Sequence, residues 1–68
     1  MNIDATLYGW VAFLPGDHFV IGGNIKDDKA KRFEDDTYVV TSLVLSIHTN
    51  KEGQLIARTQ NSVYLLEV

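Results

Sequence analysis

Carboxylate side chains are the chemically active groups that gather most densely in this 68-residue sequence. Glu34, Asp35 and Asp36 are consecutive, and Asp27 and Asp28 lie a few residues before them. Oxygen ligands of this kind bind hard cations such as Ca²⁺ and Mg²⁺. The spacing does not match an EF-hand loop, and the basic residues in the same stretch compete with a cation. The sequence therefore predicts no metal site and no bound cofactor.

Groups that could act as nucleophiles or bases are few and scattered. His18 and His48 are the two histidines, and neither has a second histidine or a cysteine at ligand spacing. A general base needs a nucleophile and an orienting partner, and no serine stands in a Gly-x-Ser-x-Gly turn. The pair Gly22-Gly23 lacks the third glycine and the Lys-Ser/Thr of a phosphate-binding loop. We therefore predict that the protein is not an enzyme.

Two aromatic residues in the first apolar segment are candidates for a binding surface. Tyr8 and Trp10 share one face of a strand, while Leu7, Val11 and Phe13 share the other. If the second face is the core, Tyr8 and Trp10 are exposed side by side, as protein interfaces prefer. If the parity is reversed, Trp10 is a central core residue and this interface does not exist.

A charged segment over residues 24–36 differs from everything around it, because nine of the fifteen charged residues fall there. We interpret it as a solvated loop that can form a single helical turn over 27–32, with acids near its start and bases near its end. We predict that it contributes to a partner interface. Its candidate binding residues are Lys26, Asp27, Asp28, Lys31, Arg32, Glu34, Asp35 and Asp36.

The remaining segments have the composition and turn signals of β-strands. No segment shows a 3.6-residue apolar period over eleven residues, which excludes helix bundles and coiled coils. Pro15-Gly16-Asp17 predicts a turn and Gly22-Gly23-Asn24 the end of a strand. The predicted strands are 6–14, 18–21, 37–47, 54–59 and 63–68.

The strand over 37–47 has the clearest alternation. Val39, Leu43, Leu45 and Ile47 fall on one parity, which predicts that they are buried, and the other parity is exposed. A strand of this length is expected to bend, and Thr41-Ser42 is the expected place.

Length and strand count together predict a single all-β domain over 1–68. A chain this short forms a small core, and without cysteine no disulfide reinforces it. A sheet of five short strands protects its unpaired edge strands most simply by curling toward a barrel. We therefore expect a small five-stranded antiparallel sheet or a partly open SH3-like barrel with one charged loop. The alternative is a two-layer antiparallel sheet that dimerises.

The charge balance indicates which classes of partner the chain is suited to bind. Six basic and nine acidic residues give a formal net charge of −3, the wrong sign for a phosphate backbone, so nucleic-acid binding ranks third among the functions considered. The N-terminal residues carry neither a basic region nor an apolar core, and no apolar run is long enough to span a membrane. We expect neither a secretory signal nor a membrane partner.

The C-terminal half contains three recognisable segments: Phe33-Glu34-Asp35-Asp36-Thr37, Val40-Thr41-Ser42 and Arg58-Thr59-Gln60-Asn61-Ser62-Val63-Tyr64-Leu65. In these segments it resembles small β-rich proteins encoded by phages and prophages. Related sequences tend to have Asp-Gly where this one has Asp35-Asp36. The resemblance implies a mobile-element origin, action in the cytoplasm of a bacterial host, and inhibition of a host protein, including CRISPR-type defence complexes. It supplies no site residue.

These observations favour a non-enzymatic protein that binds and blocks or modulates a bacterial host protein. Tyr8 and Trp10 would provide the desolvated anchor, and the charged loop would steer association. The alternative is an assembly module that forms a homodimer through a strand edge and its aromatic face.

Overall fold

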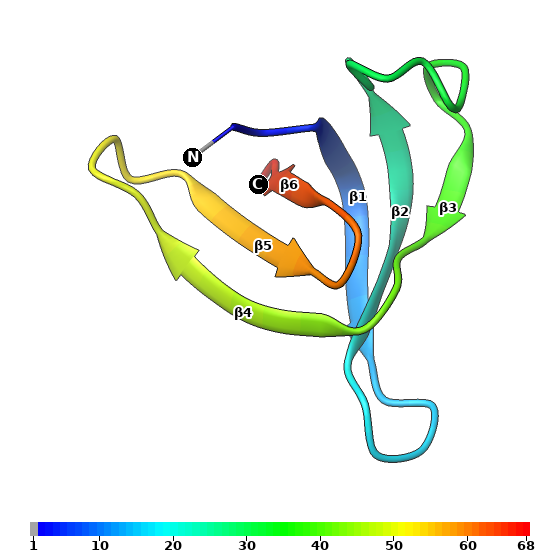
Figure 1. The fold of residues 1–68 in the computed structure, drawn as a ribbon, viewed down its shortest axis with the longest axis vertical. Helices are drawn as coiled ribbons and strands as arrows, with labels where there is room; N and C mark the ends of the chain where they lie inside the picture. The colour runs from blue at the N-terminus through cyan, green and yellow to red at the C-terminus, as the bar shows by residue number, and fades with distance from the viewer. Residues whose placement is uncertain (1) are drawn as a thin grey trace.

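Six β-strands and their connecting turns make up the computed structural model, which describes residues 2–68 (Figure 1). The strands are β1 (Ala5–Phe13), β2 (Val20–Lys26), β3 (Tyr38–Val40), β4 (Val44–Thr49), β5 (Leu55–Thr59) and β6 (Val63–Leu66). The prediction of an all-β fold is confirmed. The prediction of five strands is wrong, because the expected strand over 37–47 is interrupted at 41–43, where a bend was expected, and forms β3 and β4.

The strands form one curled, mixed sheet in the order β3-β2-β1-β6-β5-β4. All neighbours are antiparallel except β1 and β6, which run parallel, so the expected purely antiparallel sheet is also wrong. β3 and β4 are the two edge strands of this order although only residues 41–43 separate them in the chain. Within the described residues they do not pair, so the sheet is not closed.

The first hairpin is longer than its sequence signals indicated. β2 runs through Gly22-Gly23-Asn24 and ends at Lys26, so the charged loop begins at Asp27 rather than at residue 24. Antiparallel pairing holds these glycines in the strand, because Gly22 lies between Val11 and Val40 and Gly23 pairs with Val39. Tertiary pairing has overridden the local preference of glycine for a turn.

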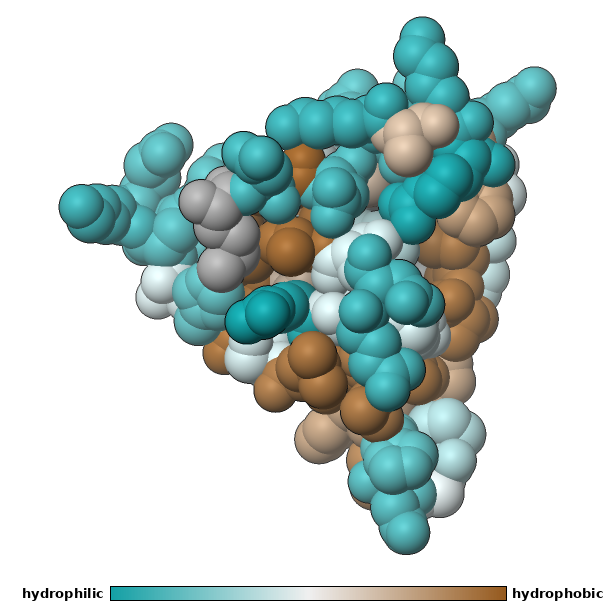
Figure 2. Space-filling view, in the orientation of Figure 1, coloured by the Kyte–Doolittle hydropathy of each residue, from teal (hydrophilic) through white to brown (hydrophobic). Residues whose placement is uncertain are grey.

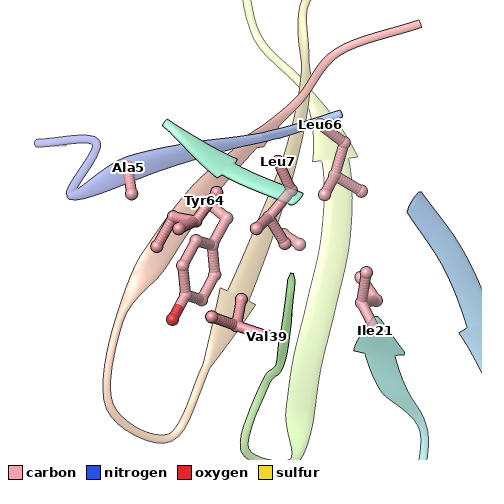
Figure 3. Packing of buried hydrophobic residues seen from close by; sticks show 8 residues of the cluster. Ala5, Leu7, Ile21, Val39, Tyr64 and Leu66 are labelled. Carbon is pink, nitrogen blue, oxygen red and sulfur yellow. The ribbon is translucent and has the colours of Figure 1, made fainter. Parts of the chain in front are cut away.

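The core lies on the concave face of the curled sheet and is built from β1, β2, β3, β5 and β6 (Figure 3). Leu7, Ile21, Ile25 and Leu66 are its largest fully buried side chains. Trp10 and Val44 pack against this cluster while remaining partly exposed.

A β-bulge in β1 decides which side chains enter this core. Tyr8 pairs with Asn24, but the next pair is Val11 with Gly22, so β1 holds one residue more than β2 between these pairs. Gly9 occupies the bulge with φ +58, a left-handed conformation that glycine adopts readily. The extra residue inverts the alternation, so Val11 and Phe13 lie on the outer face with Tyr8, opposite to buried Leu7.

A second bulge, in β4, contradicts the predicted buried face of residues 37–47. Val44 pairs with Thr59 and Ser46 with Arg58, which leaves one additional residue in β4. Val39 is buried as predicted, but Leu45 and Ile47 are exposed, and Val44 packs against the core instead. Leu45 is the additional residue of the bulge, whereas Ile47 pairs with buried Ala57 and so lies on the core side, where it stays exposed because β4 is an edge strand.

The bulge at Gly9 gives a stability prediction. Gly9→Ala should lower the free energy of unfolding by about 1–2 kcal/mol, because alanine is strained in the left-handed region. Gly9→Asn should cost less, because asparagine tolerates that region. Urea denaturation of both variants measures the difference, and equal losses would show that the space beside Asn24, rather than the backbone conformation, sets the cost.

Candidate binding surface

The outer face of β1, β2 and β3 carries a cluster of exposed apolar side chains, which we call the outer patch: Val11, Phe13, Tyr38 and Val40. Val11, Gly22 and Val40 are direct partners across the three strands, so Val11 and Val40 flank Gly22 on one face. Phe13 and Tyr38 approach the same glycine from either end, because a Cβ atom built on Gly22 would lie 3.2 Å from Phe13 Cε1 and in contact with the Tyr38 ring and hydroxyl.

The outer patch is well exposed to solvent. Tyr38 is 57%, Val40 56%, Val11 55% and Phe13 39% exposed. In the space-filling view, apolar surface follows the edge where β3 lies, directly below the charged loop (Figure 2). Contiguous apolar side chains on the surface of a small protein mark an interaction site, whereas single exposed ones do not.

A polar row borders the patch on the side of the charged loop. The Tyr8 hydroxyl donates a hydrogen bond to the Asp36 carboxylate, and Lys26 Nζ lies 5.4 Å from the centroid of the Tyr8 ring. Lys26 also forms a salt bridge of 2.8 Å with Glu67. The hydrogen bond to Asp36 raises the pKa of the Tyr8 hydroxyl, because the phenol that donates to a carboxylate resists ionisation.

The charged loop over 27–36 contains turns but no helix, so the single helical turn considered over 27–32 is absent. Asp28 organises it. Its carboxylate accepts hydrogen bonds from the main-chain N–H groups of Arg32 and Phe33, at 2.9 and 3.3 Å, and from the Arg32 guanidinium. Arg32 Nη1 in turn donates to Ser62 Oγ at 2.9 Å, which ties the loop to the β5–β6 turn.

Burial disfavours the charged form of Asp28, but hydrogen bonds from Arg32 and its positive charge outweigh that effect and hold the pKa of Asp28 below its ordinary value of 3.8. The Asp28 side chain is only 1% exposed. This carboxylate and Arg32 hold the loop together, so the buried Asp28 side chain offers a partner almost no surface.

Asp27, Lys31, Glu34 and Asp35 line an open hollow of about 580 Å³ in the loop, together with Asp28, Arg32 and Phe33. The Asp35 carboxylate accepts a hydrogen bond from the main-chain N–H of Asp27, which closes one side of the hollow. Among residues 2–68, no three histidine, aspartate or glutamate side chains gather in a way that could hold a metal ion.

The two aromatic candidates in β1 do not form one surface. Tyr8 lies on the outer face, whereas Trp10 packs against the core and donates from Nε1 to the Glu67 carbonyl at 3.1 Å. Neither arrangement considered from the sequence holds, because both assumed uninterrupted alternation through Gly9. The structure brings Tyr8 together with Lys26 and Asp36, and leaves Trp10 on the other side of the sheet.

Sequence reasoning missed all four residues of the outer patch, and a usable signal was present. A glycine inside an apolar strand often marks a bulge. A bulge placed at Gly9 would have put Val11 and Phe13 on the same outer face as Tyr8, an arrangement that neither alternative for this strand contained. Tyr38 and Val40 had been placed on the exposed parity of their strand, but the sequence did not indicate that β3 lies beside β1 and β2.

A second apolar group lies at the first hairpin and β4, where Leu14, Phe19, Leu45 and Ile47 are exposed. The Phe19 carbonyl accepts a hydrogen bond of 2.9 Å from the Val44 N–H, so the hairpin joins the start of β4.

No helix in the described part of the chain is long and apolar enough to cross a membrane. Comparisons with protein-family models, curated proteins and solved structures gave no match.

Proposed function

We propose that this chain is a non-enzymatic binding protein that attaches to another protein through the outer patch. The observation that carries the proposal is the convergence of four exposed apolar side chains around Gly22, whose missing side chain lets Phe13 and Tyr38 lie over it. A domain of this size that keeps two valines, a phenylalanine and a tyrosine together at its surface gains nothing from them in its own core. Covering such a patch is a favourable contribution to association.

The charges beside the patch define the chemistry of the partner. Asp28 pairs with Arg32 and Lys26 with Glu67, which leaves Asp27, Glu34, Asp35 and Asp36 against Lys29 and Lys31, a net charge of −2 on the loop. Asp35 and Asp36 immediately precede β3 and therefore border the patch. The partner surface that fits is apolar with lysine or arginine at its rim, because opposite charges accelerate encounter and select the orientation.

The biological setting of this proposal is that of the sequence resemblance. The partner is then a bacterial protein, in the cytoplasm of the host of a phage or mobile element, and binding blocks or modulates it. A CRISPR-type or other defence complex is one such target. Support for this setting comes from the C-terminal motifs and the small acidic character of the chain.

We also propose that the curled sheet is a partly open barrel of the SH3-like kind. The arrangement of the edge strands supports this, because β3 and β4 end the strand order and are yet consecutive in the chain. Hydrogen bonds from Val44 N–H to the Phe19 carbonyl and from Gln60 N–H to the Leu43 carbonyl draw the connection toward both halves of the sheet.

The test of the binding function compares single variants of the tagged chain in quantitative capture from bacterial lysate. Val11→Lys places a charge at the centre of the outer patch without altering the core, and we expect it to reduce capture of the specific partner at least about tenfold, as loss of a central apolar contact does. Thr49→Lys adds the same charge at an exposed position at the end of β4, the strand at the opposite end of the strand order from β3, and should leave capture unchanged.

A third variant tests the acidic rim. Glu34→Lys should weaken capture at low salt more than at high salt, because screening removes the contribution of exposed charges. Glu34 is preferable to Asp36, whose carboxylate accepts the Tyr8 hydrogen bond. If every captured protein binds Val11→Lys and the unaltered chain equally, the outer patch is not the binding surface and the proposal is wrong.

A further inference from the structure

The free edge of β3 is the feature that the proposed function does not use. Thr41 N–H donates to the Ile21 carbonyl at 2.8 Å and Ile25 N–H to the Thr37 carbonyl at 2.9 Å, so residues 37, 39 and 41 direct their main-chain groups toward β2. The N–H and C=O groups of Tyr38 and Val40 therefore point outward. Within the described residues, no turn or loop hydrogen bond involves them, and β3 lies along the outside of the molecule (Figure 1).

This edge lacks the devices by which proteins prevent strand pairing. Proteins protect their edges with lysine, proline or bulges. Tyr38-Val39-Val40 contains none of these, and its register with β2 is continuous over all three pairs. β4, the other edge, is bulged between Val44 and Ser46. The short length of β3 is the one protective feature that remains.

We propose that β3 pairs antiparallel with β3 of a second copy of this chain, about a two-fold axis that passes beside Val39. Tyr38 then lies opposite Val40 of the second copy, and Val40 opposite Tyr38. The outward N–H and C=O groups of each residue meet those of its counterpart, which gives four main-chain hydrogen bonds. One strand thus supplies both halves of a self-complementary interface, as two-fold symmetry requires.

The charges permit this pairing. The paired segment itself, Tyr38-Val39-Val40, carries no charge, so no like charges come opposite each other within it. Each cross-strand pair joins an aromatic to a β-branched side chain, a combination that stabilises neighbouring strands. The two outer patches become adjacent on one continuous sheet of β1, β2 and β3 from both copies.

Pairing of the edge leaves the outer face uncovered, so this inference goes beyond the proposed function and does not depend on it. An interface of three residues a side is well below the roughly 1,200 Å² of stable complexes. We therefore expect a weak dimer that is populated at ~1 mM and dissociated at ~1 μM, since so small an interface supports only weak association.

Sedimentation equilibrium of the full chain over this concentration range tests the dimer. Val40→Pro removes an N–H group that points away from β2, so it should keep the fold and weaken dimerisation at least about tenfold, as proline does on edge strands. Val11→Lys is the matched control, because Val11 is exposed to the same extent as Val40 on the same face but lies away from the edge. It should change the dissociation constant less than about twofold while abolishing partner capture.

Amide hydrogen exchange of the unaltered chain provides a measurement that does not depend on any variant folding. The amides of Tyr38 and Val40 should become protected as concentration rises, while those of Ile47 and Thr49 in β4 should not. A chain that stays monomeric near ~1 mM contradicts the proposal. So does association that protects β4, or that grows beyond two copies, since head-to-tail pairing of β3 with β4 would form open chains.

Discussion

Gly23→Ala should largely unfold the protein, whereas Gly22→Ala one position earlier should be nearly neutral. A Cβ atom on Gly23 would lie 2.9 Å from Trp10 Cβ, 3.1 Å from Trp10 Cα and 3.3 Å from the Tyr8 carbonyl oxygen. These atoms belong to the backbone of the bulge or are fixed directly to it, so the strand itself must move. Overpacking of this kind costs up to about 3 kcal/mol, which approaches the total that a core of this size supplies.

The added methyl group at Gly22 meets a different kind of neighbour. There the contacts are the ring ends of Tyr38 and Phe13, and the exposed Tyr38 side chain can rotate away. The smaller conformational freedom of alanine in the unfolded chain offsets part of the remaining cost, so the change should stay within about 1 kcal/mol. Urea denaturation of both variants decides the matter. Equal destabilisation would mean that the tight packing of Gly23 against the bulge does not constrain the fold.

Asp28→Asn should lower the free energy of unfolding by about 2–3 kcal/mol near neutral pH, the range for losing hydrogen bonds to a buried charged group. Asp28 Oδ1 accepts hydrogen bonds from the Arg32 guanidinium, and Asp28 Oδ2 accepts hydrogen bonds from the main-chain N–H groups of Arg32 and Phe33. An amide has only one acceptor oxygen, so one of these sets loses its partner. Asp27→Asn is the matched control on the adjacent exposed residue and should change stability by less than about 0.5 kcal/mol.

The effect of Asp28 should also depend on pH in a defined direction. Because its pKa is lower in the folded protein than its ordinary value of 3.8, the folded state favours the ionised carboxylate. This contribution is fully present above pH 3.8 and disappears as the pH falls below that value through the lowered pKa. Denaturation curves at decreasing pH should therefore show the gap between the unaltered chain and Asp28→Asn becoming smaller. A gap that is constant across this window would contradict a stabilising role for the charge.

The outer patch and the free edge of β3 are neighbours, and this affects the proposed binding function. The outer patch is on the face of β1, β2 and β3, and the dimer edge is on β3, so a dimer would present two patches side by side. Binding to a partner with two equivalent surfaces would then gain from effective concentration without any new contact. Val11→Lys should remove partner capture and preserve dimerisation, whereas Val40→Pro should weaken both, because Val40 belongs to the outer patch as well as to the edge.

The candidate site could be predicted from the sequence only in part, and the residues show why. The acidic segment was located, but the sequence left open which face Tyr8 occupies and gave no sign that Tyr8 lies beside Lys26 and Asp36. Asp28 was grouped with its exposed neighbours because composition does not reveal which carboxylate of a cluster is directed inward. Arg32, which pairs with Asp28, is itself tied to Ser62, a residue more than thirty positions from Asp28 in the chain.

By itself the sequence determined the all-β class, the turns at 15–17 and 60–62, the break near Thr41-Ser42 and the separation of a charged loop from apolar strands. These depend on local chemistry, namely alternation, β-branched side chains and turn-forming residues, which act over a few positions. Tertiary structure alone decided which faces are buried, that β1 and β6 run parallel, and that β3 and β4 are the open edges. The physical reason is that a single bulge residue, at Gly9 or in β4, inverts every later side chain of its strand, and only pairing with the neighbouring strand fixes where that residue is inserted.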